Sequence, residues 1–127
     1  MRVLAGASGP VVVDVVQLRA DALRVTIDGN ASGHGWALAL VQRKLGVDRD
    51  LAHFDLAAAR LQWLRQLARR MRGVKPPRYP TLWEAFVNTI AFQQVSLQAA
   101  SAIARRLIVA SGHPVEYEGV QLYAFPS

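Results

Sequence analysis

GVKPPRYPTLWEAFV (residues 73–87), followed closely by IAFQQVSL (residues 90–97), is the stretch that decides the fold. Its adjacent prolines forbid a helix and stiffen the segment that enters the first apolar run. The spacing of apolar residues then predicts a helix over Leu82–Phe92. A second predicted helix, Leu97–Ala110, begins after Ser96, whose hydroxyl can cap it. Two glutamines therefore lie at a short junction between two helices.

The first of these helices is predicted to begin with a capping box. Thr81 can accept a hydrogen bond from the backbone N–H of Glu84, and the Glu84 carboxylate can reach back. This helix is apolar on nearly every side, so we expect it to be central and buried. The second helix should end at Gly112 as its C′ residue. Its expected inward positions are Leu97, Ala100, Ala104, Leu107 and Ile108.

Positive charge is concentrated in the second half of the chain. The net charge is +6, but residues 1–55 hold six basic and six acidic side chains and are neutral. Residues 56–115 hold nine basic side chains against one acidic residue, Glu84. A neutral region beside a strongly basic one favours a surface that faces a polyanion. The alternative is a soluble basic protein whose arginines are simply solvated.

Size and composition narrow the class of protein. A chain of 127 residues, 52% hydrophobic and 19% charged, has enough apolar material to fold as one domain, or as one small domain and part of another. The absence of cysteine excludes disulfides and thiolate metal sites and fits a cytoplasmic location. Charged residues interrupt every apolar run, so no membrane span is expected, and the N-terminus lacks the pattern of a secretory signal.

The first half is predicted to be a small α+β unit. The β-branched run 11–16 and the alternating run 22–27 are typical of strands, and Asp28-Gly29-Asn30 is a turn signal. A helix is expected from Trp36 to Leu45, closed by Gly46, with a connector over 48–54.

A long linking helix is predicted over residues 56–72, with Asp55 as its cap. Arg65, Arg69 and Arg72 share one face of it, where like charges repel by a few tenths of a kcal/mol per pair. A bound anion would relieve this repulsion, but a solvated edge of the helix explains the pattern equally well. Lys75 and Arg78 continue the positive charge into the proline-rich entry.

No residue stands out as a catalytic acid, base or nucleophile. His34, His53 and His113 are widely spaced and share no metal-ligand pattern. Ser96 and Ser101 have no histidine or aspartate placed to activate them. The aspartates of the first half are interpreted as turn and cap residues. No phosphate-binding glycine fingerprint is present either, so no metal and no cofactor are expected.

Gln93 and Gln94 have two interpretations. Their amides can serve the free backbone carbonyls at the end of a helix. Alternatively, an amide at an exposed helix junction can enter DNA, where it can hydrogen-bond base edges or occupy the gap left by a displaced base.

The segment RGVKPPRYPTLWEAFVNTIAFQQVSLQAASAIARRL, together with the later YAFPS, resembles the start of the helix-hairpin-helix DNA glycosylase domain. The branch it is most similar to is DNA-3-methyladenine glycosylase II. That branch shows a proline-rich basic entry, a Gln-Gln-(Val/Leu)-Ser junction and an aromatic-Phe-Pro stretch. Residues 1–72, including LGVDRDLAHF, resemble more weakly the N-terminal α+β domain of the same branch.

The resemblance implies a fold, an activity and a set of roles. The fold would be an α+β domain over residues 1–72, followed from residue 73 to 127 by the first helices of an all-α glycosylase domain. The activity would be removal of alkylated bases such as 3-methyladenine from double-stranded DNA, by base flipping, in a protein that is monomeric when complete. Gln94 matches the residue that fills the gap in the duplex, and Gln93 and Ser96 match its supports.

One departure from the family pattern is large. The family's helix-hairpin-helix element and its catalytic aspartate lie downstream of the Phe-Pro stretch, so they are expected beyond Ser127. The chain is therefore expected to be a truncated product or a fragment, inactive alone, with the apolar faces of its last two helices partly uncovered. Two alternatives stay open: a non-catalytic DNA-binding module, and a protein-interaction piece that needs a second polypeptide.

Overall fold

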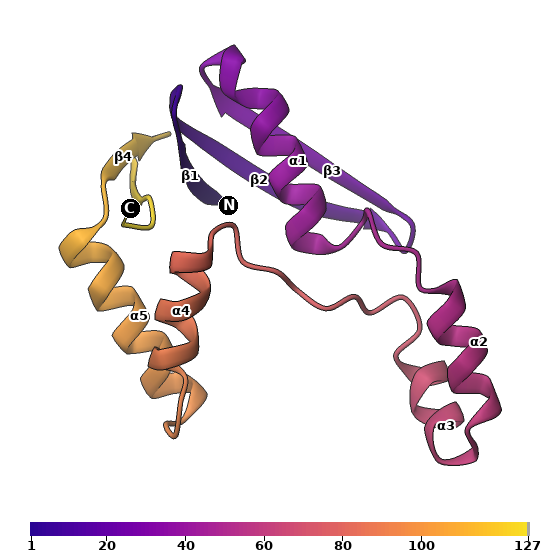
Figure 1. The fold of residues 1–127 in the computed structure, drawn as a ribbon. Helices are drawn as coiled ribbons and strands as arrows, with labels where there is room; N and C mark the ends of the chain where they lie inside the picture. The colour runs from indigo at the N-terminus through magenta and orange to yellow at the C-terminus, as the bar shows by residue number, and fades with distance from the viewer. Residues whose placement is uncertain (127) are drawn as a thin grey trace. The chain divides into compact units, whose positions relative to one another are not determined.

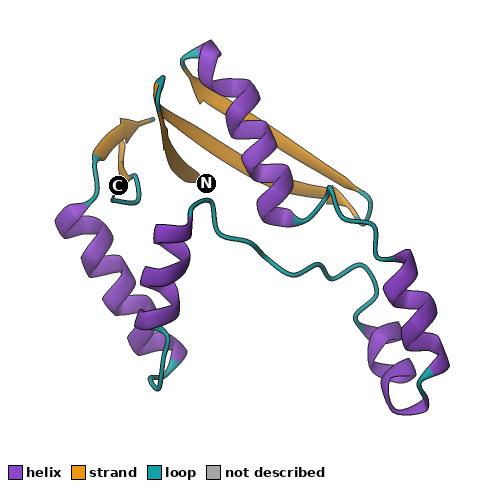
Figure 2. Ribbon diagram, viewed as in Figure 1, coloured by secondary structure: helices purple, strands orange, loops and turns teal. Residues whose placement is uncertain are grey.

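A computed structural model describes residues 1–126 as an α+β chain, which confirms the expected fold class (Figures 1 and 2). Its strands are β1 (Arg2–Gly6), β2 (Gly9–Arg19), β3 (Ala22–Gly29), β4 (Pro114–Tyr117) and β5 (Val120–Tyr123). Its helices are a short 3-10 turn (Ala31–Gly33), α1 (His34–Leu45), α2 (Ala52–Arg60), α3 (Gln62–Arg70), α4 (Leu82–Ala91) and α5 (Leu97–Ser111). No helix among the described residues is long and apolar enough to cross a membrane.

The chain forms two compact units, and each is described by itself. The first combines Met1–Leu40 with Tyr79–Ser127, and the second is Val41–Arg78. The expected domain boundary between residues 72 and 73 stays a prediction.

The first unit is built on an antiparallel sheet in the order β1-β2-β3. Both predicted strands are present and longer than expected, while β1 was not predicted. Val11, Val12 and Val13 of β2 are all buried, although their side chains alternate between the two faces. The sheet is therefore covered on both faces in this region. On one face Val11 lies beneath Gly33, the last residue of the 3-10 turn before α1, where an added Cβ would lie 3.1 Å from the Val11 side chain.

The opposite face is covered by a hairpin that the sequence did not predict. β4 and β5 pair in antiparallel fashion, with Tyr117 opposite Val120, so only Glu118 and Gly119 form the turn. Both turn residues have positive φ, 50° and 75°, as a type I′ turn requires. Val115, Tyr117 and Leu122 of the hairpin pack on a buried cluster of Val3, Val12 and Ala124.

The predicted linking helix over 56–72 is wrong as a single element. The structure has α2 and α3 instead, separated at Leu61, whose φ of −93° and ψ of 112° are extended. The first of them starts at Ala52, so the expected connector 48–54 is partly helical, and Asp55 lies inside its first turn rather than capping it. Asp50 accepts a hydrogen bond from the Ala52 N–H at 2.8 Å in its place.

Helices α4 and α5 confirm the predicted pair to within one residue at their ends and lie side by side (Figure 1). The expectation that α4 is buried is wrong for the described chain. Its apolar stripe is open, with Leu82 72%, Phe86 56% and Ile90 68% exposed. Leu97, expected to face inward on α5, is 74% exposed, while Ala100 is fully buried. The expected uncovered apolar faces are therefore present.

Gly112 ends α5 for a different reason from the predicted one. Its φ of −83° and ψ of 163° are extended, so it is not a left-handed C′ residue. A Cβ at this position would lie closer than 3.0 Å to the carbonyl oxygens of both Ala124 and Ile108. Glycine is needed here because the end of α5 meets the chain that leaves β5.

Candidate nucleic-acid interface

The junction between α4 and α5 is short and exposed. It holds Gln93 and Gln94, and both side chains are open to solvent. The last turn of α4 closes through two backbone hydrogen bonds, from Phe92 N–H to Asn88 O at 2.9 Å and from Gln93 N–H to Ile90 O at 3.2 Å. The structure thus brings both predicted glutamines to one exposed helix junction.

Gln94 has a φ of 55°, in the left-handed region that favours glycine. For an L-residue with a Cβ this conformation is unfavourable by about 1–2 kcal/mol. Within the described chain only Gln94 and Glu118 combine a side chain with positive φ, and Glu118 belongs to a type I′ turn. Backbone strain of this kind is typical of functional positions, because the surrounding structure holds a residue there for its side chain.

Ser96 has the predicted capping role. Its Oγ accepts a hydrogen bond from the backbone N–H of Ala99 at 3.2 Å, with φ −63° and ψ 152°. The cap lies two residues after Gln94 and fixes the start of α5 at Leu97. The direction of the junction is therefore set by local backbone geometry on its α5 side.

The second unit contains a basic hollow of about 670 Å³, formed by α2, α3 and the segment after them. Arg65, Arg69, Arg72 and Lys75 line it, so the three arginines predicted to share a face lie in one hollow although they do not belong to one helix. Asp50 and Asp55 also line it, which leaves positive charge in excess. The remaining lining residues are mainly small or apolar, as at Ala59 and Ala68.

Three of the predicted basic residues have partners within the second unit. Arg65 Nε donates to Ala59 O at 2.8 Å, at the end of α2, and Lys75 Nζ donates to Arg49 O. Arg78 Nη2 pairs with Asp48 Oδ1 at 2.6 Å. Arg69 and Arg72 make no hydrogen bond or ion pair that involves the described residues. These two arginines are the cations in the hollow that a ligand anion could reach without breaking a contact.

Glu84 is a functional candidate that the sequence did not reveal. Thr81 Oγ1 accepts from the Glu84 N–H at 3.0 Å, so half of the capping box is confirmed. The other half is wrong, because the Glu84 carboxylate turns to Arg2, with Nη2 to Oε2 at 2.5 Å. A capping box explained Glu84 locally, and only the fold shows that a residue 82 positions away holds it.

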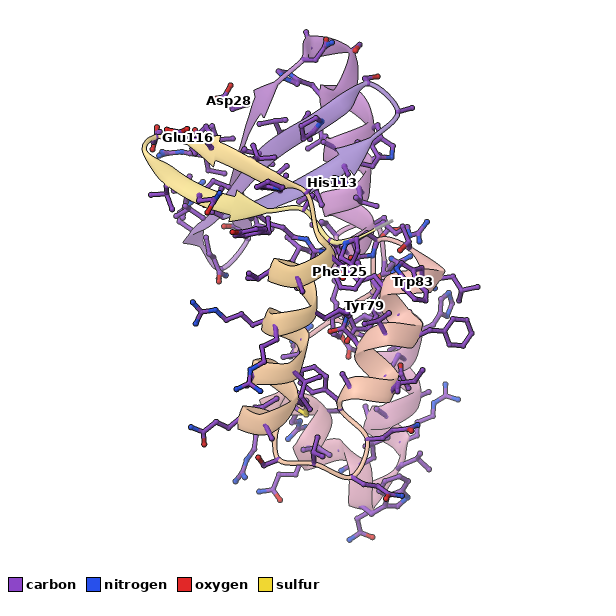
Figure 3. The ribbon with its side chains drawn as sticks, turned by 90° about the vertical axis from the view of Figure 1, so that its left-hand side faces the viewer. Asp28, Tyr79, Trp83, His113, Glu116 and Phe125 are labelled. Atoms are coloured by element: carbon purple, nitrogen blue, oxygen red, sulfur yellow. The ribbon has the colours of Figure 1, made fainter. Side chains whose placement is uncertain are left out.

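A small hollow of about 260 Å³ lies beside this ion pair. Its lining includes Trp36, Trp83 and Phe125, and Figure 3 shows Trp83 at the start of α4 with Phe125 beyond the hairpin. Trp83 Nε1 donates to Pro126 O at 3.0 Å. Within residues 1–126 no group of three or more His, Cys, Asp or Glu side chains is placed to hold a metal ion.

One tyrosine outside these sites has a perturbed titration. The pKa of Tyr117, on the hairpin, is raised above its usual value, first by desolvation and then by the nearby charges of Glu118 and Asp28. Figure 3 shows Asp28 near the tip of this hairpin. The side chain of Tyr117 serves packing on the sheet and is not part of the glutamine junction.

The chain matches no family model and no curated protein. Solved structures do match it. One is a 3-methyladenine DNA-glycosylase from Archaeoglobus fulgidus, with a TM-score of 0.84 and 20% identity over 99% of this chain. Another is MBOgg1 in complex with a low-affinity DNA ligand, with a TM-score of 0.73 and 22% identity over 98% of this chain.

These similarities establish the fold. The chain has the fold of part of a DNA glycosylase. It spans 44% of the length of each of the two solved structures. The expected resemblance is thus confirmed at the level of a glycosylase fold, and the assignment to DNA-3-methyladenine glycosylase II stays a prediction.

Proposed function

We propose that this chain is part of a DNA repair N-glycosylase that removes alkylated bases such as 3-methyladenine from double-stranded DNA by base flipping. The observation that carries the proposal is the conformation of Gln94 in a glycosylase fold. It is an exposed side chain at a helix junction, held at positive φ. The similarity to a 3-methyladenine DNA-glycosylase supports the choice of lesion.

In the proposed mechanism, Gln94 enters the duplex as the damaged nucleotide leaves it. Flipping costs a few kcal/mol of stacking and pairing, and a side chain in the gap offsets part of that cost. The amide of Gln94 can also donate to and accept from the orphaned base. Gln93 and Ser96 support the junction, and Ser96 does so by capping α5.

The basic residues are proposed to contact DNA phosphates and so to position the protein without reading sequence. Arg69 and Arg72 are the foremost candidates, followed by Arg65, Lys75 and Arg78, which would exchange an internal partner for a phosphate. We assign no catalytic role to any residue of the described chain. We further propose that the reaction needs no cofactor, that the complete protein is a monomer and that it is located in the cytoplasm.

The test is a comparison of gapped and intact DNA. A duplex that contains an abasic-site analogue already has the gap, so the chain need not expel a base to fill it. We expect binding at least about tenfold tighter than to the intact duplex, equivalent to about 1.4 kcal/mol. Gln94→Ala should remove this preference and leave single-strand binding unchanged, because a single strand has no gap to fill. Fluorescence anisotropy with labelled oligonucleotides measures all three affinities.

Gln98→Ala is the matched control, since Gln98 is also exposed and lies in the first turn of α5. It should retain the preference for gapped duplex. Equal affinity of the parent chain for intact and gapped duplex would contradict the proposed role of Gln94, and equal losses on duplex and single strands would make that role structural.

The second candidate function is a non-catalytic DNA-binding or protein-interaction module that works with a separate polypeptide. The uncovered stripe of Leu82, Phe86 and Ile90 favours it, because large exposed apolar patches mark interaction surfaces. Under this function the preference for gapped DNA would be absent, while salt-sensitive binding to DNA would persist.

A further inference from the structure

The first turn of α4 is attached to the sheet by a partly buried ion pair between Glu84 and Arg2. The Glu84 side chain is 6% exposed, and that of Arg2, the first residue of β1, is 34% exposed. An acidic residue in the first turn of a helix is also favoured by the helix dipole. Glu84 is held from both directions, and its burial without Arg2 would leave an unpaired charge in the interior.

Helix α4 packs along one side against α5, where Val87, Asn88 and Ala91 are half-buried. Its stripe of Leu82, Phe86 and Ile90 is exposed and contributes no packing along that side. The other polar attachment to a distant segment, Trp83 Nε1 to Pro126 O, lies in the same first turn. Apart from its packing on α5, the helix is therefore attached at its start, and the glutamine junction lies at its far end.

Because of the length of α4, a small change of its tilt at the first turn moves Gln94 by a larger distance. With 10 residues at 1.5 Å per residue, α4 is about 15 Å long. A tilt of roughly 10° at the anchored turn would move the far end by about 2.5 Å. A displacement of this size is enough to take a side chain out of a gap the width of one nucleotide.

We propose that Arg2 and Glu84 are positioning residues that fix the place of the Gln94 junction relative to the sheet. The functional meaning of this placement rests on the proposed role of Gln94. The placement itself does not, and the experiment measures it without DNA, so failure of one proposal is distinguishable from failure of the other.

The absence of native cysteine permits site-specific spin labels. Gln93→Cys places one label at the junction and leaves Gln94 intact, and Thr26→Cys places the other on an exposed position of β3. Pulsed dipolar spectroscopy then gives the distribution of distances between the labels. We expect a single narrow distribution in the labelled parent.

The test variant combines Arg2→Met with Glu84→Gln. It removes both charges and keeps side-chain volume, so no buried charge is left unpaired. We expect the mean distance to shift by about 2 Å or more, or the distribution to double in width, with an unchanged far-UV circular dichroism spectrum. Arg2→Lys, which keeps the charge, should give a distribution between those of the parent and the double variant.

Arg19→Met with Asp21→Asn is the matched control. This ion pair spans 3.8 Å, and its side chains are 79% and 84% exposed. Its removal should leave the distribution unchanged. A parent-like distribution in the folded Arg2/Glu84 double variant overturns the proposal. Should that variant lose its helical spectrum, Glu84→Gln alone replaces it with the same expected shift, because the Arg2 side chain left behind is 34% exposed and can be solvated. A parent-like distribution there overturns the proposal equally.

Discussion

At the scale of single residues, two positions that carry a side chain have positive φ among the described residues. Glu118 needs its positive φ to close a two-residue hairpin, whereas Gln94 lies in a loop where glycine would satisfy the backbone at no steric cost. Its side chain is exposed and forms no hydrogen bond that involves the described residues. The physical interpretation is that the strain is kept for the sake of the amide.

Gln94→Gly should therefore stabilise the chain while removing the preference for gapped DNA. Relief of the left-handed strain contributes about 1–2 kcal/mol, and the greater freedom of glycine in the unfolded chain offsets about 0.5–1 kcal/mol of it. The expected net gain is roughly 0.5–1 kcal/mol, measured by urea denaturation. A loss of stability would mean that the Gln94 side chain makes a stabilising contact.

At the scale of elements, helix ends and helix junctions depend on contacts beyond the local caps. Leu61 separates α2 from α3 without a proline or glycine, and the Arg65 side chain binds a carbonyl at the end of α2. The end of α5 is determined by close approach to Ala124, which also donates its N–H to His113 O at 2.9 Å. Helix ends here depend on packing as much as on local capping.

Gly112→Ala tests this statement. A Cβ closer than 3.0 Å to two carbonyl oxygens forces backbone to move, because neither contact is with a flexible side chain. We expect destabilisation of about 1–3 kcal/mol, the range for an overpacked site. Thermal and urea unfolding followed by circular dichroism give the measurement.

Gly35→Ala serves as the control for that variant. Gly35 lies in α1, where an added methyl group would meet nothing within 4 Å, and alanine is the better helix former by up to about 1 kcal/mol. It should be neutral or stabilising. Similar losses of stability in both variants would show that replacing either glycine is harmful. The contact with Ala124 would then not explain the need for glycine at position 112.

At the scale of the whole molecule, the distribution of charge favours a partner with many phosphates. The excess of positive charge in residues 56–115 includes the arginines of the basic hollow, and Arg69 and Arg72 are there without an acidic partner among the described residues. Electrostatic contacts of this kind give affinity without sequence preference.

Binding to undamaged duplex should therefore be weak and strongly dependent on salt. The logarithm of the affinity should fall with the logarithm of salt concentration at a slope of about −0.9 per phosphate contact. The double variant Arg69→Gln with Arg72→Gln should lose nearly the contribution of two phosphate contacts to that slope. Arg24 is an exposed arginine of the neutral half, and Arg24→Gln should leave the slope unchanged. An affinity for duplex DNA that does not change with salt concentration would contradict the proposed phosphate contacts.

The 127-residue chain by itself should release no base. Hydrolysis needs a carboxylate beside the sugar and a pocket for the flipped base. The carboxylate of Glu84 lies beside a hollow but is paired with Arg2. Asp48 is paired with Arg78, and Asp50 accepts a hydrogen bond from the N–H of Ala52 at the start of α2. Incubation with DNA that contains 3-methyladenine, followed by quantification of free base above the spontaneous rate, is the measurement. Release that disappears in Glu84→Gln would reveal an active site at Arg2 and Glu84.

The sequence alone determined the features that depend on neighbours along the chain. Thr81 and Ser96 were predicted as caps and make those hydrogen bonds, because a cap and its N–H lie three residues apart. Strands β2 and β3 and the exposed glutamine junction follow from equally local patterns. The basic half of the chain was found by counting charged residues along the sequence.

Only the tertiary structure decided the features that depend on distant segments. Glu84 pairs with Arg2, which lies near the start of the chain. Glycine is needed at position 112 because the backbone of Ala124 passes close to it. The hairpin of β4 and β5 packs on buried residues of β1 and β2. The exposure of α4 also belongs here, because an apolar pattern states which side chains avoid water but not whether another element covers them. The physical reason is that these contacts are set by packing in space, which the spacing of residues along a chain does not encode.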